Sequence, residues 1–395
     1  MTNAPKLPSS PPVIDRKLLL FSQIPVARSG ATWVTMDLWA WDINVNATFV
    51  DIVLCCPVQA NPEPGWAALA ENIQVRDLSE NRAQSQCLTL VREATLVQIP
   101  GNSGWTSSAY CRKLVRAARV ARRPIFMGIS SNRARTNLLN SATKSYWKRV
   151  AARLRYLDIR YSQRWLARRV TGVFLVGDGL LPLVAGIASN IHIGIASWIS
   201  DKYINSMKRG YSVELRVCMA GRLERMKGFH IGLDAISKAA LSPVRTTIIG
   251  SGPERANLLK QAKSLGNQDT RFLEPVPYPE PFFRILDDND LVLLTNLNDE
   301  QPRLIFDAAS RGCIPVCPRT EAYMRLGLDT RTLYTAGDAD SLADCLRYLA
   351  DRDTRIEIAA KLPDLAHRYT IQSMHTRRLA WMLTLDQPVE TAVSY

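Results

Sequence analysis

Two cations stand five residues apart in the second half of the sequence, where an apolar run gives way to a helical pattern. Arg222 and Lys227 follow the predicted strand 214–220 and lie between Gly221 and Gly228. Two cations at the end of a strand can bind one polyanion together, and a diphosphate is the ligand whose two charges need both. Cations are also common in surface loops, so this spacing alone is a weak signal and favours solvated side chains.

A glycine-rich turn, Gly250-Ser251-Gly252, follows the next predicted strand, 244–249, and Glu254 opens the helix after it. Glycines in such a turn let the backbone approach a ligand closely. An ordinary connection between a strand and a helix has the same composition, so the turn by itself leaves both readings open.

Carboxylates cluster around a third strand end, after the apolar run 290–294. Asp299 and Glu300 precede Pro302, which suits the first position of a helix. Free N–H groups and the dipole at a helix start favour a phosphate group. Asp307 lies about a turn and a half inside this helix, in reach of the hydroxyls of a bound ribose.

Short apolar runs alternate with helical patterns along the whole chain, which predicts parallel sheets covered by helices on both faces. The predicted strands are 17–21, 49–55, 94–99, 124–128 and 172–176 in the first half, and 214–220, 244–249, 290–294 and 313–317 in the second. Helices are predicted at 110–121 and 180–188. Ligands of such sheets bind at the carboxyl ends of the strands, so we expect two Rossmann-like, doubly wound domains that face a ligand-binding cleft.

The 395 residues, 47% hydrophobic and 22% charged, are enough for two globular domains. The expected divisions are a disordered lead (1–16), a first domain (17–200), a polar linker (201–213), a second domain (214–375) and a C-terminal helix and tail (376–395). The lead has no apolar stretch, so no signal peptide is expected. The apolar region 170–199 is interrupted by polar residues, glycines and a proline, which argues against a membrane span. Eight cysteines without a CxxC pair are expected to be core thiols in the cytoplasm.

The positive charge is concentrated in one stretch of the first half. Residues 111–170 carry seventeen Lys or Arg and one acid, in a chain whose net charge is +14. Apolar residues between 146 and 157 recur at helical spacing, which predicts a basic amphipathic helix. The cations assigned to this basic patch are Lys144, Lys148, Arg149 and Arg153. The patch suits an anionic membrane surface, and a helix docked on its own domain fits as well. Nucleic acid is not expected, because no nucleic-acid motif accompanies the patch.

The motifs RLxxxKG, GSGPER and DEQPRxxxDAxxxGxxPV occur in this order within residues 214–350. Together they resemble the donor-nucleotide half of the retaining GT-B glycosyltransferases of family 4, also called glycosyl transferase group 1. That family carries an R-x4-K pair, a GxGPxxxxL turn and an E-x7-E motif. The resemblance implies a GT-B fold and sugar transfer with retention from a nucleotide-diphosphate sugar, with no bound metal or other cofactor. The acidic run 287–290 precedes a strand and is typical of a solvated turn rather than a metal site.

The resemblance also implies roles for single residues. Arg222 and Lys227 would neutralise the donor diphosphate as the glycosidic bond breaks, and Asp299 would face the donor sugar; these three are the catalytic candidates. The expected donor-binding residues are Gly221, Gly250, Ser251, Gly252, Glu300, Gln301, Pro302, Arg303 and Asp307. Both acids of the motif are glutamates in the family, and Glu300 is the alternative to Asp299.

The first half matches the family only loosely. Many relatives carry a glycine pair after the first strand, where the acceptor approaches, and this chain has only Gly30 in that loop. The first histidine is His192, close to the linker, and it is expected to be structural.

The expected protein is therefore a hexosyltransferase with a nucleotide-diphosphate sugar and a lipid-linked or carbohydrate acceptor as partners, active in exopolysaccharide or lipopolysaccharide assembly. Its expected place is the cytoplasm, at the inner face of the cytoplasmic membrane. Two alternatives stay open: a non-catalytic GT-B-like protein that binds a nucleotide or a partner, and a sugar-nucleotide epimerase.

Overall fold

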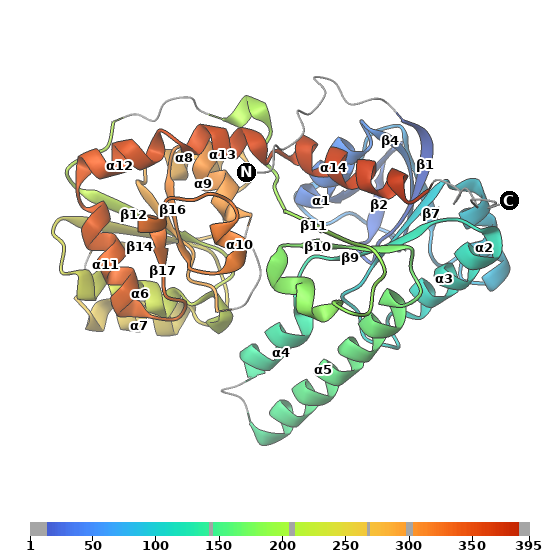
Figure 1. Ribbon diagram of the computed structural model, residues 1–395, viewed down its shortest axis with the longest axis horizontal. Helices are drawn as coiled ribbons and strands as arrows, with labels where there is room; N and C mark the ends of the chain where they lie inside the picture. Colours follow the sequence, from blue (N-terminus) through green and yellow to red (C-terminus); the bar gives the residue numbers. More distant parts are fainter. Residues whose placement is uncertain (1–13, 142–144, 205–209, 267–268, 298–302, 387–395) are drawn as a thin grey trace, which may run out of the picture.

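The computed structural model describes residues 14–141, 145–204, 210–266, 269–297 and 303–386. These residues form two α/β domains, and the chain crosses between the domains twice (Figure 1). No helix in the described part of the chain is both long and apolar enough to span a bilayer.

The first domain is built on a seven-stranded sheet of parallel neighbours, in the order β11-β10-β9-β8-β1-β4-β7. Its strands are β1 (Ile14–Phe21), β4 (Val50–Cys56), β7 (Ile73–Asp77), β8 (Leu96–Pro100), β9 (Ile125–Ile129), β10 (Gly172–Val176) and β11 (Ile191–Gly194). Its helices are α1 (Asp37–Asn46), α2 (Gln84–Glu93), α3 (Ala109–Ala121), α4 (Arg133–Ser141), α5 (Tyr146–Ala167) and the 3₁₀ helix η1 (Asp178–Leu183).

Helices cover both faces of this sheet because successive side chains of a strand point to opposite sides. In the inner strand β1, Leu19 packs with the core under α2 and α3, whereas Leu18 and Leu20 pack with the core under α1 and α14 (Ile371–Thr384). A small four-stranded sheet, β5-β2-β3-β6, lies beside them. Its strands are β2 (Val26–Ser29), β3 (Thr32–Met36), β5 (Val58–Gln59) and β6 (Trp66–Ala68).

The second domain has a six-stranded parallel sheet in the order β14-β13-β12-β15-β16-β17. Its strands are β12 (Leu215–Ala220), β13 (Val244–Ile249), β14 (Thr270–Leu273), β15 (Leu291–Leu293), β16 (Ile314–Pro318) and β17 (Leu333–Tyr334). Its helices are α6 (Phe229–Ala239), α7 (Arg255–Ser264), α8 (Glu280–Asp287), α9 (Leu304–Ser310), α10 (Glu321–Met324), α11 (Ala339–Leu349), α12 (Arg352–Ala359) and α13 (Leu362–Arg368). The 3₁₀ helices η2 (Asp201–Tyr203), η3 (Arg225–Lys227) and η4 (Thr330–Thr332) complete the described elements. The helices on both faces of this sheet pack against it through one continuous buried core.

These sheets confirm the predicted fold of two doubly wound parallel α/β domains. Each of the nine predicted strands is present, with ends displaced by up to three residues. β1 begins at Ile14, so three residues that we assigned to the lead belong to the strand. The helix predicted at 180–188 is wrong: the chain forms the 3₁₀ helix η1 there, and it contains Pro182, which has no N–H to donate.

The last helix, α14, returns to the first domain and packs on α1 and β11 (Figure 1). It begins at Ile371, five residues before the C-terminal helix and tail that the sequence suggests. The N–H of Ile371 donates a hydrogen bond of 2.8 Å to the carbonyl of Ile199, so the outgoing and returning crossings are joined to each other.

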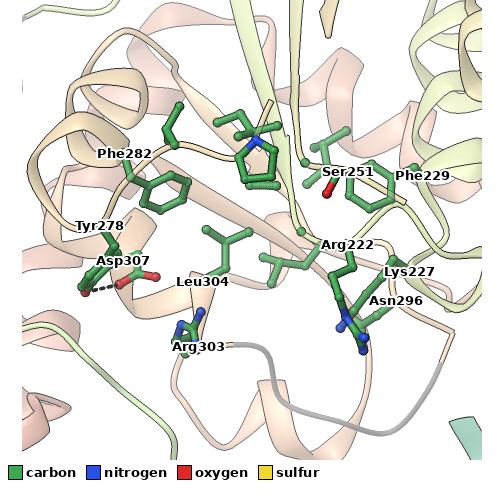
Figure 2. Close-up of a pocket in the computed structure, with 18 of the residues that line it drawn as sticks. Arg222, Lys227, Phe229, Ser251, Tyr278, Phe282, Asn296, Arg303, Leu304 and Asp307 are labelled. Carbon is green, nitrogen blue, oxygen red and sulfur yellow. Dashed lines mark hydrogen bonds between the residues drawn. The ribbon is translucent and has the colours of Figure 1, made fainter. Parts of the chain in front are cut away.

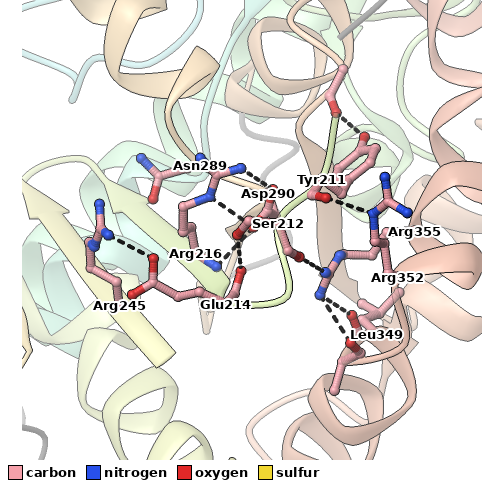
Figure 3. Close-up of polar contacts among 12 residues, drawn as sticks. Tyr211, Ser212, Glu214, Arg216, Arg245, Asn289, Asp290, Leu349, Arg352 and Arg355 are labelled. Atoms are coloured by element: carbon pink, nitrogen blue, oxygen red, sulfur yellow. Dashed lines mark hydrogen bonds and ion pairs between the residues drawn. The ribbon is translucent and has the colours of Figure 1, made fainter. Parts of the chain in front are cut away.

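The end of the polar linker is fixed to the second domain (Figure 3). The hydroxyl of Tyr211 donates to the carbonyl of Gly312 at 2.6 Å. Arg352 donates from Nε to the Tyr211 carbonyl at 2.8 Å, and Arg355 donates from Nη2 to the Ser212 carbonyl at 2.6 Å. These bonds give β12 a defined starting point.

Candidate functional site

A cavity of about 540 Å³ lies at the carboxyl ends of β12, β13 and β15 (Figure 2), and Leu38 of α1 lines it from the first domain. We call it the strand-end cavity. Its lining residues are Leu38, Ala220, Gly221, Arg222, Lys227, Phe229, Ile249, Gly250, Ser251, Pro275, Val276, Tyr278, Phe282, Leu293, Leu294, Thr295, Asn296, Arg303, Leu304 and Asp307. Seven of the residues singled out from the sequence are thus brought together: Gly221, Arg222, Lys227, Gly250, Ser251, Arg303 and Asp307.

The two cations of the opening motif lie at one end of this cavity, together with Asn296 (Figure 2). Lys227 ends η3, and its carbonyl accepts a hydrogen bond of 2.8 Å from Thr295. The side chain of Arg222 is 73% exposed and lies 3.1 Å from a carboxylate oxygen of Glu224. The other oxygen of Glu224 accepts from Asn140 of α4 at 3.1 Å, so the first domain contacts the cation loop directly.

The glycines of the two loops are required by close packing. A Cβ on Gly228 would fall on the carbonyl oxygen of Thr295, and a Cβ on Gly250 would fall on the carbonyl oxygen of Gly221. Gly250 has a φ of 146°, in the region that favours glycine. Gly252 packs against the backbone of Leu223 and does not line the cavity. The glycines therefore let the cation loop and the turn after β13 lie against each other.

Replacing Gly250 by alanine is expected to destabilise the protein by about 3 kcal/mol or more, because the new methyl group meets backbone that cannot move aside. Urea unfolding measures this loss. Gly266→Ala is the matched control: Gly266 also has a positive φ, of 70°, but open space around it, and we expect a loss of about 1 kcal/mol from strain alone. Equal losses in the two variants would contradict the packing argument.

A buried carboxyl group lies at the other end of the cavity (Figure 2). Asp307 is 2% exposed, and burial raises its pKa to about 6 although the nearby Arg303 acts against this rise. The hydroxyl of Tyr278 donates to Oδ1 of Asp307 at 3.2 Å. The guanidinium of Arg303 stacks 3.1 Å from the centre of the Trp198 ring, and its pKa is lowered by burial. This end of the cavity offers a carboxylate acceptor and a held cation to a polar ligand.

The rest of the predicted acidic motif is not placed. Asp299, Glu300, Gln301 and Pro302 lie outside the described residues. The first helical residue of α9 in the structure is Leu304, with Arg303 at the N-cap. Among the described residues, no group of three or more His, Cys, Asp or Glu side chains is arranged to hold a metal ion.

The sequence reasoning missed the apolar wall of the cavity. Pro275, Val276 and Tyr278 come from the segment between β14 and α8, and Phe282 comes from the first turn of α8. The signal was the run of aromatic and proline residues from 275 to 283, which is unusual for a solvated loop. A flat apolar wall beside a polar end suits a ligand that has both a ring and charged groups.

Gly30 lies in the exposed turn between β2 and β3, with a φ of 61° that accounts for the glycine. It does not line the strand-end cavity. Its acceptor-side role stays a prediction.

The predicted basic helix is present as α5. Lys148, Arg149 and Arg153 are exposed on it, and Lys144 lies outside the described residues. The buried residues of α5 all lie in its second half, from Ile159 onward, so this half packs into the first domain. The first half extends away from the first domain beside α4 (Figure 1).

The apolar side chains of this first half are not covered. The exposed fractions are 63% for Tyr146, 77% for Trp147, 64% for Leu154 and 61% for Leu157. One of the two interpretations of the sequence was that this helix docks its apolar side chains on its own domain. That interpretation is wrong for these residues.

Residues 214–352 match the family model described as glycosyl transferases group 1. This match spans β12 to the start of α12. It includes every strand of the second sheet and no strand of the first. Comparison of the sequence with curated proteins gave no match.

Solved structures match over almost the whole chain. HepE of Anabaena, in complex with UDP and glucose, has a TM-score of 0.64 and 16% identity, and the match covers 93% of this chain and 99% of HepE. Sucrose-phosphate synthase of Thermosynechococcus elongatus has a TM-score of 0.66 and 10% identity, with coverage of 94% and 99%. The lipopolysaccharide outer core galactosyltransferase WaaB, in its apo form, has a TM-score of 0.62 and 14% identity, with coverage of 94% and 100%. The two-domain arrangement of this chain is thus the GT-B fold, as predicted.

Proposed function

We propose that the protein is a retaining glycosyltransferase, because residues 214–352 match the group 1 glycosyltransferase model and the whole chain has the GT-B fold. It transfers a hexose from a nucleotide-diphosphate sugar to an acceptor hydroxyl. The observation that carries the proposal is the strand-end cavity, which brings Arg222 and Lys227 to one end and Asp307 to the other, with an apolar wall beside Asp307.

The chemistry that these residues can perform is electrostatic. Breaking the bond between the sugar and the diphosphate develops negative charge on the leaving phosphate and positive charge on the anomeric carbon. Arg222 and Lys227 stabilise the first of these charges without a metal, and fixed charges of this kind are usually the largest contribution of such a site. Asp307 accepts hydrogen bonds from the ribose hydroxyls, and the wall around Tyr278 and Phe282 holds the base.

The donor and the acceptor follow from the same proposal. HepE was solved with UDP and glucose, and WaaB is a lipopolysaccharide galactosyltransferase. These likenesses support a UDP-hexose as the first donor to test, and a lipid-linked or polysaccharide intermediate as the acceptor.

We also propose that the protein works at an anionic membrane surface, with α5 as the contact. Trp147, Leu154 and Leu157 form an exposed apolar stripe at helical spacing, flanked by the exposed cations Arg149 and Arg153. Each apolar side chain gains by leaving water, and each cation near an anionic surface adds about 1 kcal/mol. This combination places an enzyme beside an acceptor that is carried on lipid.

A donor panel tests the proposed activity. The purified chain is incubated with several nucleotide sugars, with and without a lipid-linked acceptor, and the products are identified by mass and by the NMR coupling of the anomeric proton. Transfer or donor hydrolysis, with the anomeric configuration of the donor kept, supports the proposal. Nucleotide binding without turnover would instead favour a binding protein, and an epimerised donor would favour an epimerase.

The acid limb of the pH profile is expected to follow Asp307. Its pKa of about 6 means that the carboxylate form, which accepts the ribose hydroxyls, is lost as the pH falls through 6. We expect kcat/KM for the donor to fall below about pH 6, because this ratio reports the free enzyme. The Tyr278 hydroxyl stabilises the carboxylate, so Tyr278→Phe raises the pKa of Asp307 and moves the limb to higher pH.

Tyr348→Phe is the control for this shift, since Tyr348 is half exposed on α11 and does not line the cavity. A limb that stays in place in Tyr278→Phe, or that moves to lower pH, would contradict the role given to Asp307.

A further inference from the structure

A second cavity, of about 290 Å³, lies where the two domains meet, and it shares no lining residue with the strand-end cavity. We call it the seam cavity. Asp178 and His192 line it from the first domain, Arg325 from the second, and Arg377 and Arg378 from α14. Its walls include the ends of β10 and β11, so it opens at the ligand-binding edge of the first sheet.

One of the three arginines is already paired across the domains. Arg325 lies 3.0 Å from a carboxylate oxygen of Asp178, and 3.8 Å from Glu321 on its own helix. Among the described residues that line the cavity, Asp178 is the one with a carboxylate.

The other two arginines retain donors for a ligand. Arg378 lines the cavity, and its Nη2 donates to Nδ1 of His375 at 2.6 Å, which holds the guanidinium in place. Arg377 donates to the carbonyl of Arg368 at 3.2 Å, and no carboxylate among the described residues is paired with it. A guanidinium has five N–H donors, so both side chains can bind a further acceptor.

His192 completes the group of cations and polar donors. Its ring stacks on Trp381 with the centroids 5.2 Å apart. Its pKa is lowered by burial and then by Arg378 and Arg377, so the surroundings of its ring are positive. An anion bound beside these arginines would offset this effect.

We propose that the seam cavity is a binding site for a phosphate or carboxylate group of a small acidic ligand. Two arginines with unused donors, in a partly apolar cavity where charges attract strongly, are suited to bind such a group at two points. The volume suits a ligand of the size of pyrophosphate or a hexuronic acid. Because both domains and α14 line the site, the bound ligand holds the two domains together. The inference does not depend on sugar transfer.

The imidazole of His192 provides a local reporter. The chain has four histidines, so the ¹H–¹³C NMR spectrum of the full-length protein is simple, and a His192→Gln variant assigns the resonance. Pyrophosphate and glucuronate are titrated separately. We expect a saturable shift of the His192 resonance and a rise of its pKa with at least one of them. His230, next to Phe229 of the strand-end cavity, reports separately on binding there.

Two variants test the assignment to the arginines. Arg377→Gln is expected to weaken the effect on His192 by about tenfold or more, since it removes a charged donor. Arg284→Gln removes an exposed arginine of α8 outside both cavities and should leave the affinity unchanged. A response to pyrophosphate alone identifies a phosphate site, and a response to glucuronate alone identifies a carboxylate site; either supports the proposal.

The proposal is overturned if the His192 resonance does not move with either probe up to about 20 mM, which is weaker than any specific affinity of interest. It is also overturned if the dissociation constant in Arg377→Gln equals that of the unchanged protein. Sugar transfer is measured on the same preparations. If the His192 resonance does not respond, the proposed activity is unaffected; if sugar transfer is absent, the His192 titration still decides whether the seam cavity binds an anion.

Discussion

Lys227→Ala is expected to lower the turnover number for sugar transfer by about 10²–10³-fold, with little change in stability. The side chain lines the same end of the strand-end cavity as Arg222, where the leaving diphosphate gains charge. Removing a preorganised positive charge affects the transition state more than the bound donor, so we expect kcat to fall more than the affinity for the donor. Initial rates at saturating donor measure the effect, and thermal unfolding confirms that the variant is folded.

Arg225→Ala is the matched control for this experiment. Arg225 is exposed and begins the same 3₁₀ helix, η3, but it does not line the cavity. Its replacement should leave turnover within about twofold of the unchanged protein, because a solvated charge outside the site is screened. Turnover of Lys227→Ala at the level of this control would show that the diphosphate is bound elsewhere.

Replacing Trp147, Leu154 and Leu157 together by serine is expected to weaken binding to anionic vesicles by at least about 100-fold. Each of these side chains is more than 60% exposed, so the change removes little packing from the folded protein. Sedimentation with vesicles of phosphatidylcholine containing about 30% phosphatidylserine measures the binding. We expect the unchanged protein to bind these vesicles and to bind much less to phosphatidylcholine alone.

The control for the triple variant carries Val120→Ser and Ile356→Ser. Both residues are exposed apolar residues outside α5, at 68% and 44% exposure. This control should bind vesicles as the unchanged protein does. Equal binding by the triple variant, or no binding by the unchanged protein, would remove α5 from the proposed membrane contact.

The sequence predicted the second half of the molecule better than the first. Arg222, Lys227 and Asp307 follow strands whose apolar runs are bounded by glycine or polar residues, and parallel strands bring such ends to one edge. Tyr278 was missed because its partner, Asp307, is 29 residues away and the pairing depends on tertiary packing. The order of the strands around β15 is likewise set by crossovers rather than by local pattern.

In the first half of the molecule, sequence patterns could not predict which apolar side chains are exposed. Helical periodicity located α5, but this periodicity is the same whether an apolar stripe is buried or exposed. The exposure of Trp147 and Leu154 could therefore be learned only from the structure. The small sheet next to Gly30 has strands of two to five residues, too short for a reliable alternation of apolar and polar residues.

The hydrogen bond between Ile371 and Ile199 limits how the two domains can move. Two chain segments that are held side by side resist sliding past each other, so we expect the domains to rotate about this junction. The cation loop also meets α4 through Glu224 and Asn140, and α4 lies well away from α14 in the first domain (Figure 1). We therefore expect that opening of the domains for exchange of ligands separates Glu224 from Asn140 and Arg325 from Asp178, while the hydrogen bond between Ile371 and Ile199 is kept.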